Sequence, residues 1–276
     1  PFFQKLIFKW FWQCVAMAMN SDTNPYGADG VLVLSGPQGI GKTTFFRVIA
    51  ILPKLFKEGA EIDPKNKDSI IQATRNWITE LGELDRTTKR DQSAIKAIIT
   101  AAVDHNRDAY AVKAIKKVRR ASFCGTVNQG DYLIDDTGNR RFWTVPVERI
   151  DLERLLSLDQ EWLIQLWAQV YEAFKEEPQG FRLTAKERGQ LEAMNQRFLA
   201  PMRYESEVLE LLDFDLPVEE WQEGLTARIA RLLQAVGNAG PVGKVLAKIA
   251  RNDTRIITGH TRRGTTYVLP LKKVYF

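Results

Sequence analysis

A glycine-rich segment near the start of the chain contains residues whose types and spacing suit phosphate chemistry. Residues 36–44 read Gly-Pro-Gln-Gly-Ile-Gly-Lys-Thr-Thr, which matches the Walker A pattern in full. The glycines let consecutive backbone N–H groups face a phosphate, Lys42 places a charge near its oxygens, and the Thr43 hydroxyl is suited to Mg²⁺. The nucleotide-binding residues predicted are Gly36, Gln38, Gly39, Ile40, Gly41, Lys42, Thr43 and Thr44.

The acids that such a site needs are predicted at the end of a neighbouring strand. Residues 77–84 read as an apolar strand that carries Glu80 and Glu83. We expect Glu80 on the magnesium side and Glu83 to polarise the attacking water, although the two roles could be exchanged. Either residue alone could also be a surface acid or a helix cap.

Polar residues also follow or precede two later apolar strands, predicted at 118–127 and 141–147. Asn128 could hydrogen-bond the γ-phosphate or the attacking water, but Asn at a strand end is also a common turn residue. Arg140 and Arg141 fit an arginine finger, a charge that stabilises the transition state of phosphoryl transfer. A structural salt bridge is the alternative for this pair.

The elements around these residues predict an α/β fold. Residues 31–34 are an apolar run before the glycine loop, and a helical pattern follows it, which is the order that a phosphate-binding unit requires. Alternating strands and helices indicate a mostly parallel sheet. We expect an AAA+-like P-loop core with an N-terminal helix over residues 1–150, a helical connector over 151–215, and a basic winged-helix-like module over 216–276.

Two segments are basic enough to contact nucleic acid. Residues 107–120 carry six Lys or Arg residues against one Asp and are predicted to form a hairpin, although a solvated charge cluster is nearly as good an interpretation. The candidates for DNA contact there are Arg107, Lys113, Lys116 and Lys117. Residues 221–276 contain ten basic and two acidic residues, which indicates a polyanionic partner.

The end of the chain is predicted to be a winged helix. Helices are expected at 219–236 and 242–251, and strands at 255–258 and 267–269. The turn between the two strands contains Arg262 and Arg263, which would be the wing tip that contacts DNA.

Composition excludes several other classes of protein. The two cysteines, Cys14 and Cys124, predict neither a disulfide framework nor a zinc site, so we expect reduced thiols and a cytoplasmic location. The apolar residues 2–19 are interrupted by Lys5 and Lys9, so we expect a buried helix and no membrane association. The chain begins with Pro, from which we expect a fragment of a longer protein.

Four segments, taken together, carry a family resemblance. They are residues 34–44 (LSGPQGIGKTT), 77–85 (WITELGELD), 123–128 (FCGTVN) and 138–143 (GNRRFW). They closely resemble the virulence-associated protein E family, whose phage- and island-borne ATPases are similar to superfamily 3 helicases within the AAA+ class. The resemblance covers residues 2–147 with specific motifs and is loose beyond them.

The resemblance implies a homo-oligomeric ring, hexameric or similar, that uses ATP and Mg²⁺ while moving on single-stranded DNA. It also implies a frequent fusion to an upstream primase-polymerase domain. It supports Asn128 as sensor 1, Arg140 and Arg141 as a finger that reaches a neighbour's site, and residues 107–120 as a pore hairpin. The sequence departs from the family in one respect, because its two strand acids are three residues apart rather than adjacent.

We therefore expect an ATP-driven DNA helicase or translocase that acts in the replication of a phage or mobile element, with single-stranded and duplex DNA as partners. The main alternative is a DNA-binding, origin-associated ATPase that recruits a helicase without unwinding DNA itself. A small-molecule kinase built on the same loop is disfavoured by the two separate basic elements.

Overall fold

The computed structural model divides the chain into two compact units, Pro1–Ala200 and Pro201–Phe276. It describes residues 2–82, 84, 95–106, 115–128, 130, 132–134, 139–233, 239–262 and 264–272. The sequence-based boundaries at 150 and 215 therefore differ from the structural one at 200. The physical reason is packing: the Trp167 indole donates to the carbonyl of Ile49 at 2.8 Å, and residues 151–200 of the expected connector belong to the first unit.

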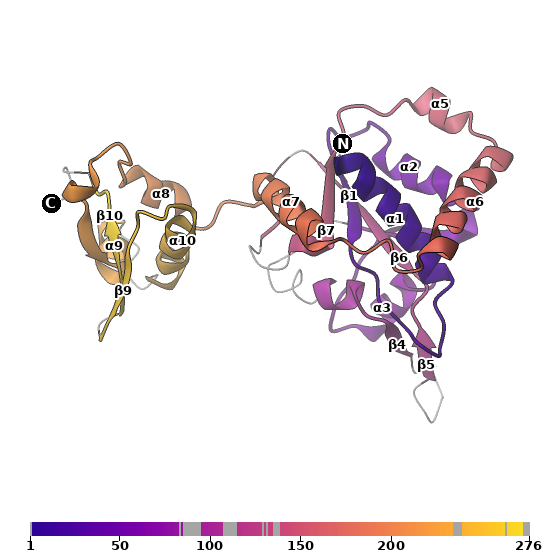
Figure 1. The fold of residues 1–276 in the computed structure, drawn as a ribbon, viewed down its shortest axis with the longest axis horizontal. Helices are drawn as coiled ribbons and strands as arrows, with labels where there is room; N and C mark the ends of the chain where they lie inside the picture. The colour runs from indigo at the N-terminus through magenta and orange to yellow at the C-terminus, as the bar shows by residue number, and fades with distance from the viewer. Residues whose placement is uncertain are drawn as a thin grey trace. The chain divides into compact units, whose positions relative to one another are not determined.

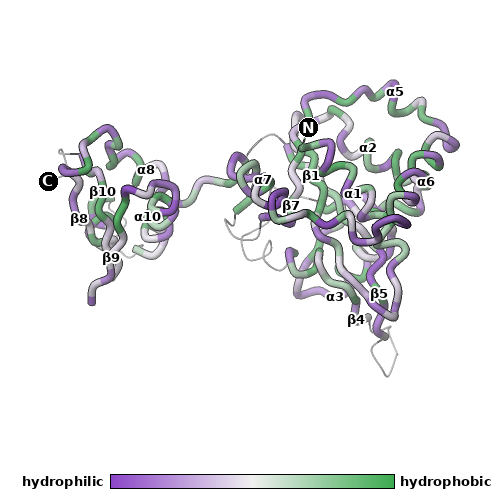
Figure 2. Tube along the Cα trace, in the orientation of Figure 1, coloured by the Kyte–Doolittle hydropathy of each residue, from purple (hydrophilic) through white to green (hydrophobic). Residues whose placement is uncertain are grey.

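A five-stranded sheet, all of it parallel, forms the centre of the first unit (Figure 1). Its strands, in spatial order, are β2 (Phe56–Ala60), β3 (Ile78–Leu81), β6 (Ser122–Val127), β1 (Val31–Ser35) and β7 (Phe142–Pro146). Every residue of β1 is buried, and Figure 2 shows this strand in the green of hydrophobic residues. A parallel sheet covered on both faces needs such continuous apolar strands, so the predicted α/β fold with a mostly parallel sheet is confirmed.

Six helices with described bounds belong to this unit. They are α1 (Phe2–Ala18), α2 (Lys42–Ile49), α3 (Lys67–Ala73), α5 (Leu152–Leu156), α6 (Gln160–Glu176) and α7 (Ala185–Asn195). The apolar N-terminal segment forms α1, whose Trp10 indole donates to the carbonyl of Phe123 at 2.8 Å and thereby anchors the helix to β6. None of the described helices is long and apolar enough to cross a membrane.

A short antiparallel hairpin precedes β6. Its strands are β4 (Val103–Asn106) and β5 (Ile115–Val118), and the turn between them lies outside the described residues. The sequence predicted one strand over 118–127, but the structure separates β5 from β6 at Arg119. This arginine is only 1% exposed, and its guanidinium binds the Asp104 carboxylate through two nitrogens. The buried ion pair therefore fixes the base of the hairpin.

The second unit has its own core and a three-stranded antiparallel sheet in the order β8-β10-β9. Its elements are α8 (Glu205–Glu210), β8 (Gln222–Leu225), α9 (Thr226–Leu232), α10 (Ala239–Asn252), β9 (Thr258–Thr261) and β10 (Gly264–Leu269). The helix predicted over 219–236 is wrong in its first part, because β8 pairs there with β10. Its second part overlaps α9, and a hairpin follows α10 as the sequence predicts.

Candidate nucleotide site

The glycine loop lies where an open α/β sheet usually binds its ligands. The loop leaves the carboxyl end of β1, next to the carboxyl end of β6. The chain continues from β1 to β2 at one edge of the sheet and from β6 to β7 at the other. Neighbouring strands whose connections run in opposite directions define a topological switch point, which is the usual ligand position in such sheets.

Close packing explains the glycines of this loop. Gly39 and Gly41 have φ angles of 82° and 93°, a backbone conformation that residues with a side chain rarely adopt. At Gly36 a Cβ atom would lie 2.0 Å from the carbonyl oxygen of Val147, so no larger residue fits there. The spacing in the sequence therefore corresponds to real backbone constraints in the fold.

The Lys42 side chain folds back over the loop that precedes α2. Its amine donates to the carbonyl oxygens of Gly36 at 2.8 Å and Pro37 at 2.6 Å. The residue is only 6% exposed, and burial lowers the pKa of its amine. The loop thus holds one buried ammonium group among backbone groups that could face an anion.

A buried carboxylate from β3 meets the first turn of α2. The Thr43 hydroxyl donates to Glu80 Oε1 at 2.7 Å, and the Thr126 hydroxyl of β6 donates to the same oxygen at 3.0 Å. Burial raises the pKa of Glu80, and the two hydroxyl donors oppose that shift because they favour the ionised form. The arrangement is a pair of oxygen atoms, Thr43 Oγ1 and Glu80 Oε1, at the first turn of the helix that begins with Lys42.

A cavity of about 340 Å³ brings Lys42, Thr43 and Thr126 together with Asn128. Its lining consists of Gln38, Gly39, Gly41, Lys42, Thr43, Thr44, Thr126 and Asn128. The sequence analysis missed Thr126, which its place two residues before Asn128 on a strand could have revealed. Glu83 lies outside the described residues. Within the described part of the chain, no group of three or more His, Cys, Asp or Glu residues is placed to hold a metal.

Arg140 and Arg141 do not join this cavity in their own chain. They lie in a 3₁₀ turn, Asn139–Arg141, directly before β7, and the parallel register aligns Phe142 with Val31 at the start of β1. The glycine loop begins after Ser35, at the other end of that strand. A five-residue strand at roughly 3.3 Å per residue separates the two positions by about 16 Å.

The predicted DNA-binding residues are only partly described. Lys116 and Lys117 are exposed on β5, whereas Arg107 and Lys113 lie outside the described residues. In the second unit Arg262 is exposed at the end of the β9–β10 hairpin, and Arg263 lies outside the described residues. The structure thus leaves three of these six side chains on accessible hairpins.

Comparison with known proteins places the chain in a family. The Virulence-associated protein E-like domain matches residues 1–200, so the chain belongs to this family, as the motifs predict. No curated protein matches it.

Solved structures of the C-terminal region of NrS-1 give distant matches. The apo structure of residues 305–718 shares 13% identity over 97% of this chain and 71% of that one, with a TM-score of 0.40. The A form apo structure of the region shares 12% identity over 99% and 76%, with a TM-score of 0.39.

Proposed function

We propose that this chain is a Mg²⁺-dependent ATP hydrolase that acts on DNA in the replication of a phage or mobile element. The observation that carries the proposal is the 2.7 Å contact between Thr43 and Glu80, at the first turn of the helix that Lys42 begins. Phosphate-loop enzymes require a loop cation, a hydroxyl ligand and a strand carboxylate at one place. Membership of the Virulence-associated protein E-like family supports the replication context.

The oxygen ligands at this site suit Mg²⁺. In the proposal Thr43 and Glu80 hold the ion, which prefers oxygen ligands and neutralises charge on the β- and γ-phosphates when bound. Lys42 would exchange its two carbonyl acceptors for phosphate oxygens. The backbone N–H groups around Gly39 and Gly41 would bind the remaining oxygens, and the N-terminus of α2 would face the same phosphates.

The remaining polar residues take supporting roles in the proposal. Asn128, which lines the cavity, orients the γ-phosphate or the attacking water. Glu83 polarises that water, unless it exchanges roles with Glu80. Arg140 and Arg141 act on the site of a neighbouring copy, because the length of β1 separates them from their own glycine loop. A ring of copies, hexameric or similar, would bring the two together.

The exposed hairpins are proposed to serve DNA. In a ring, the β4–β5 hairpin would carry Arg107, Lys113, Lys116 and Lys117 to a single strand in the channel. The hairpin of the second unit would bring Arg262 and Arg263 to duplex DNA. On this basis ATP turnover drives translocation or unwinding.

One observation favours a second candidate function. The second unit has a core of its own, so it could anchor the protein at a DNA site independently of any movement. In that case the chain would be an origin-associated ATPase that recruits a helicase without unwinding duplex DNA itself.

The test compares wild type with Lys42→Ala, with Lys54→Ala as the matched control, since Lys54 is an exposed lysine of the same unit. We expect ATP hydrolysis that single-stranded DNA stimulates, its loss in Lys42→Ala and its retention in Lys54→Ala. Charge-assisted contacts to phosphate are the strong class of hydrogen bond, which is why the loss is expected. Turnover near the wild-type rate in Lys42→Ala would refute the site. A forked-duplex assay then separates unwinding from recruitment.

A further inference from the structure

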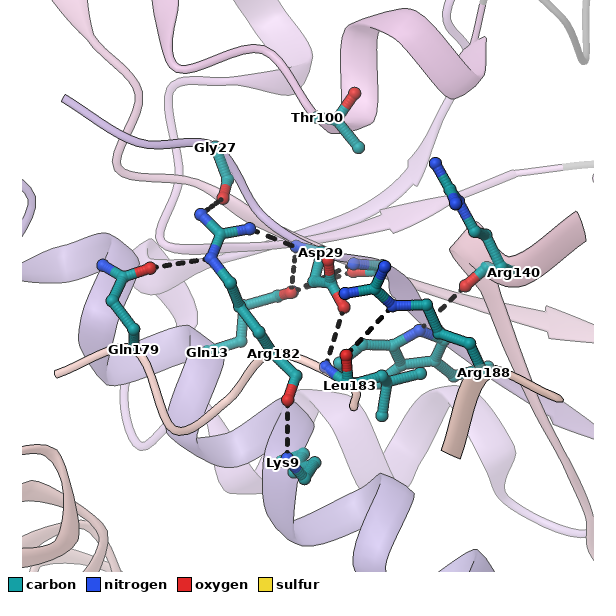
Figure 3. Close-up of polar contacts among 12 residues, drawn as sticks. Lys9, Gln13, Gly27, Asp29, Thr100, Arg140, Gln179, Arg182, Leu183 and Arg188 are labelled. Carbon is teal, nitrogen blue, oxygen red and sulfur yellow. Dashed lines mark hydrogen bonds and ion pairs between the residues drawn. The ribbon is translucent and has the colours of Figure 1, made fainter. Parts of the chain in front are cut away.

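A second polar cavity lies at the amino end of the sheet and contains an unusual concentration of arginines. It has a volume of about 250 Å³ and is lined by Asp29, Thr100, Arg140, Arg141, Arg182 and Arg188. In Figure 3 the guanidinium groups of Arg182 and Arg188 flank Asp29, and the side chain of Arg140 lies on the Arg188 side. The motifs of the sequence did not single out Arg182 or Arg188.

Charge is unbalanced in this cavity. Asp29 is the only acid among the described residues of the lining, and it accepts the backbone N–H of Leu183 at 3.0 Å while lying 3.7 Å from Arg182 Nη1. Among the described residues no carboxylate lies within ion-pair distance of Arg140, Arg141 or Arg188. The three guanidinium groups that have no carboxylate partner repel each other around the cavity unless an anion binds between them.

One of these arginines has an unsatisfied donor. The Nε atom of Arg141 is buried and has no hydrogen-bond partner among the described residues. A buried donor without an acceptor carries a desolvation cost, and the cost is greater for a charged group. An anion bound by the other guanidinium nitrogens of Arg141 would offset part of that cost.

The surrounding structure holds the arginines in place. Arg182 Nε donates to Gln179 Oε1 at 2.7 Å, and Arg188 Nε donates to the Leu183 carbonyl at 3.0 Å (Figure 3). The Asn195 amide at the end of α7 donates to the carbonyls of Asn139 and Phe142, both at 2.9 Å, and so fixes the turn that carries Arg140 and Arg141. Such prior ordering reduces the entropy lost on binding.

We propose that this cavity binds a compact phosphate-bearing anion, either inorganic (poly)phosphate or the terminal phosphate of a nucleotide. Guanidinium forks match phosphate oxygens in pairs, and several forks around one cavity suit a multiply charged group. The described residues of the lining include no aromatic or aliphatic side chain that could hold a base, so the phosphate itself is the group that we propose the cavity recognises. The inference rests on the proposed function and deepens it, because Arg140 and Arg141 belong both to the proposed arginine finger and to the lining of this cavity.

The experiment uses the full chain with Lys42→Ala, so that the glycine loop does not dominate binding. We expect calorimetric titration with pyrophosphate at low salt to show one site per chain. Arg141→Gln or Arg188→Gln should weaken it about tenfold or more, and Arg188→Lys should weaken it less because the charge remains. Arg197→Gln, an exposed arginine of the same unit, should bind as its parent does.

Circular dichroism checks that each variant is folded, and the charge-retaining Arg188→Lys guards against a merely structural effect. Absence of pyrophosphate binding, or an affinity in Arg141→Gln and Arg188→Gln equal to that of the parent chain, would overturn the proposal. A second arm titrates single-stranded DNA without a terminal phosphate. Displacement of pyrophosphate by that DNA through the same arginines would assign the cavity to a nucleic-acid backbone and overturn the proposal as well.

A third arm adds ATP, which should compete with pyrophosphate if a nucleotide is the source of the phosphate. Pyrophosphate binding together with an absence of ATPase activity in the wild-type chain would refute the proposed function while leaving this inference intact.

Discussion

The two ends of the central sheet differ in how completely their polar groups are satisfied. At the carboxyl end Lys42 donates to two carbonyls and Glu80 accepts two hydroxyl donors, so the buried charges have local partners. At the amino end Arg141 has a buried donor without an acceptor, and Arg140 lies exposed beside it. Among the described residues, the charges at the carboxyl end therefore have partners within the chain, whereas the amino end leaves a charged donor unsatisfied.

This difference has a geometric cause. The loop after β1 and the turn before β7 occupy opposite ends of two adjacent parallel strands, so no side-chain rotation brings them together. The β4–β5 hairpin also lies at the amino end, because β5 leads through Arg119 to the start of β6. A single chain thus separates its candidate nucleotide site from the basic β4–β5 hairpin, and the proposed completion of the site would involve two copies.

The largest effect is expected at the carboxyl end of the sheet, from the substitution Glu80→Gln. Loss of the ionised ligand should lower ATP turnover roughly 10- to 100-fold, the usual range when a group that supports a metal is removed. Burial raises the pKa of Glu80 in the metal-free site. At sub-saturating Mg²⁺ the wild-type rate should therefore fall on the acid side at a higher pH than an ordinary carboxyl group would produce, because protons compete with Mg²⁺ for Glu80.

That acid limb should be absent from the pH profile of Glu80→Gln, whose amide does not titrate. The matched control is Glu61→Gln, an exposed acid of the same unit, which should retain both the rate and the profile. An acid limb that is identical in Glu80→Gln and wild type would show that another group controls it.

At the amino end, Asp104→Ala tests how the hairpin is held. It would leave the 1%-exposed Arg119 guanidinium without its carboxylate, and breaking a buried pair in this way costs about 3–5 kcal/mol of unfolding free energy. Denaturant unfolding followed by tryptophan fluorescence measures this loss of unfolding free energy, since six of the seven tryptophans belong to the first unit.

The matched control for this variant is Glu58→Ala, which breaks the half-exposed Arg47–Glu58 pair. Exposed pairs contribute roughly 0–1 kcal/mol, so the control should be nearly neutral. Equal losses in Asp104→Ala and Glu58→Ala would mean that the buried pair does not brace the hairpin.

The smallest expected effect concerns the hairpin lysines. Replacing Lys113, Lys116 and Lys117 with Ala should weaken single-stranded DNA binding and reduce its salt dependence by roughly two units of slope, since each lost phosphate contact contributes about 0.7. Basal ATP turnover should survive because the glycine loop is untouched. Replacing the exposed lysines Lys54, Lys57 and Lys65 is the charge-matched control. Unchanged DNA binding in the hairpin variant would make the segment a solvated surface.

The residues of the candidate nucleotide site could be selected from the sequence because its determinants are local. The glycine spacing, the strand before it and the helix after it all lie within residues 31–49, and Glu80 is marked by its place on an apolar strand. Periodicity alone could not divide the 118–127 segment, because the break depends on a buried ion pair with Asp104, which belongs to a different strand.

The arginine cavity could not be predicted for the same physical reason. Arg182 and Arg188 come from the segment before α7 and from α7 itself, and only the packing of α7 against the Asn139–Arg141 turn brings them to Arg141. Likewise the sequence predicts helix over the residues of β8, because their pairing partner, β10, comes at the end of the chain. Each of these errors arose where a contact between distant segments overrides the local pattern.

The central claim is that the two ends of the sheet complete one another between copies of the chain. The most direct measurement mixes Lys42→Ala chains, which lack the loop cation but keep the arginines, with chains carrying both Arg140→Ala and Arg141→Ala. The arginine variant alone should bind ATP but turn it over roughly 10³-fold more slowly. The account predicts that mixed oligomers recover turnover that neither variant shows alone. A mixture that stays inactive, although mass measurement shows mixed oligomers, would contradict it.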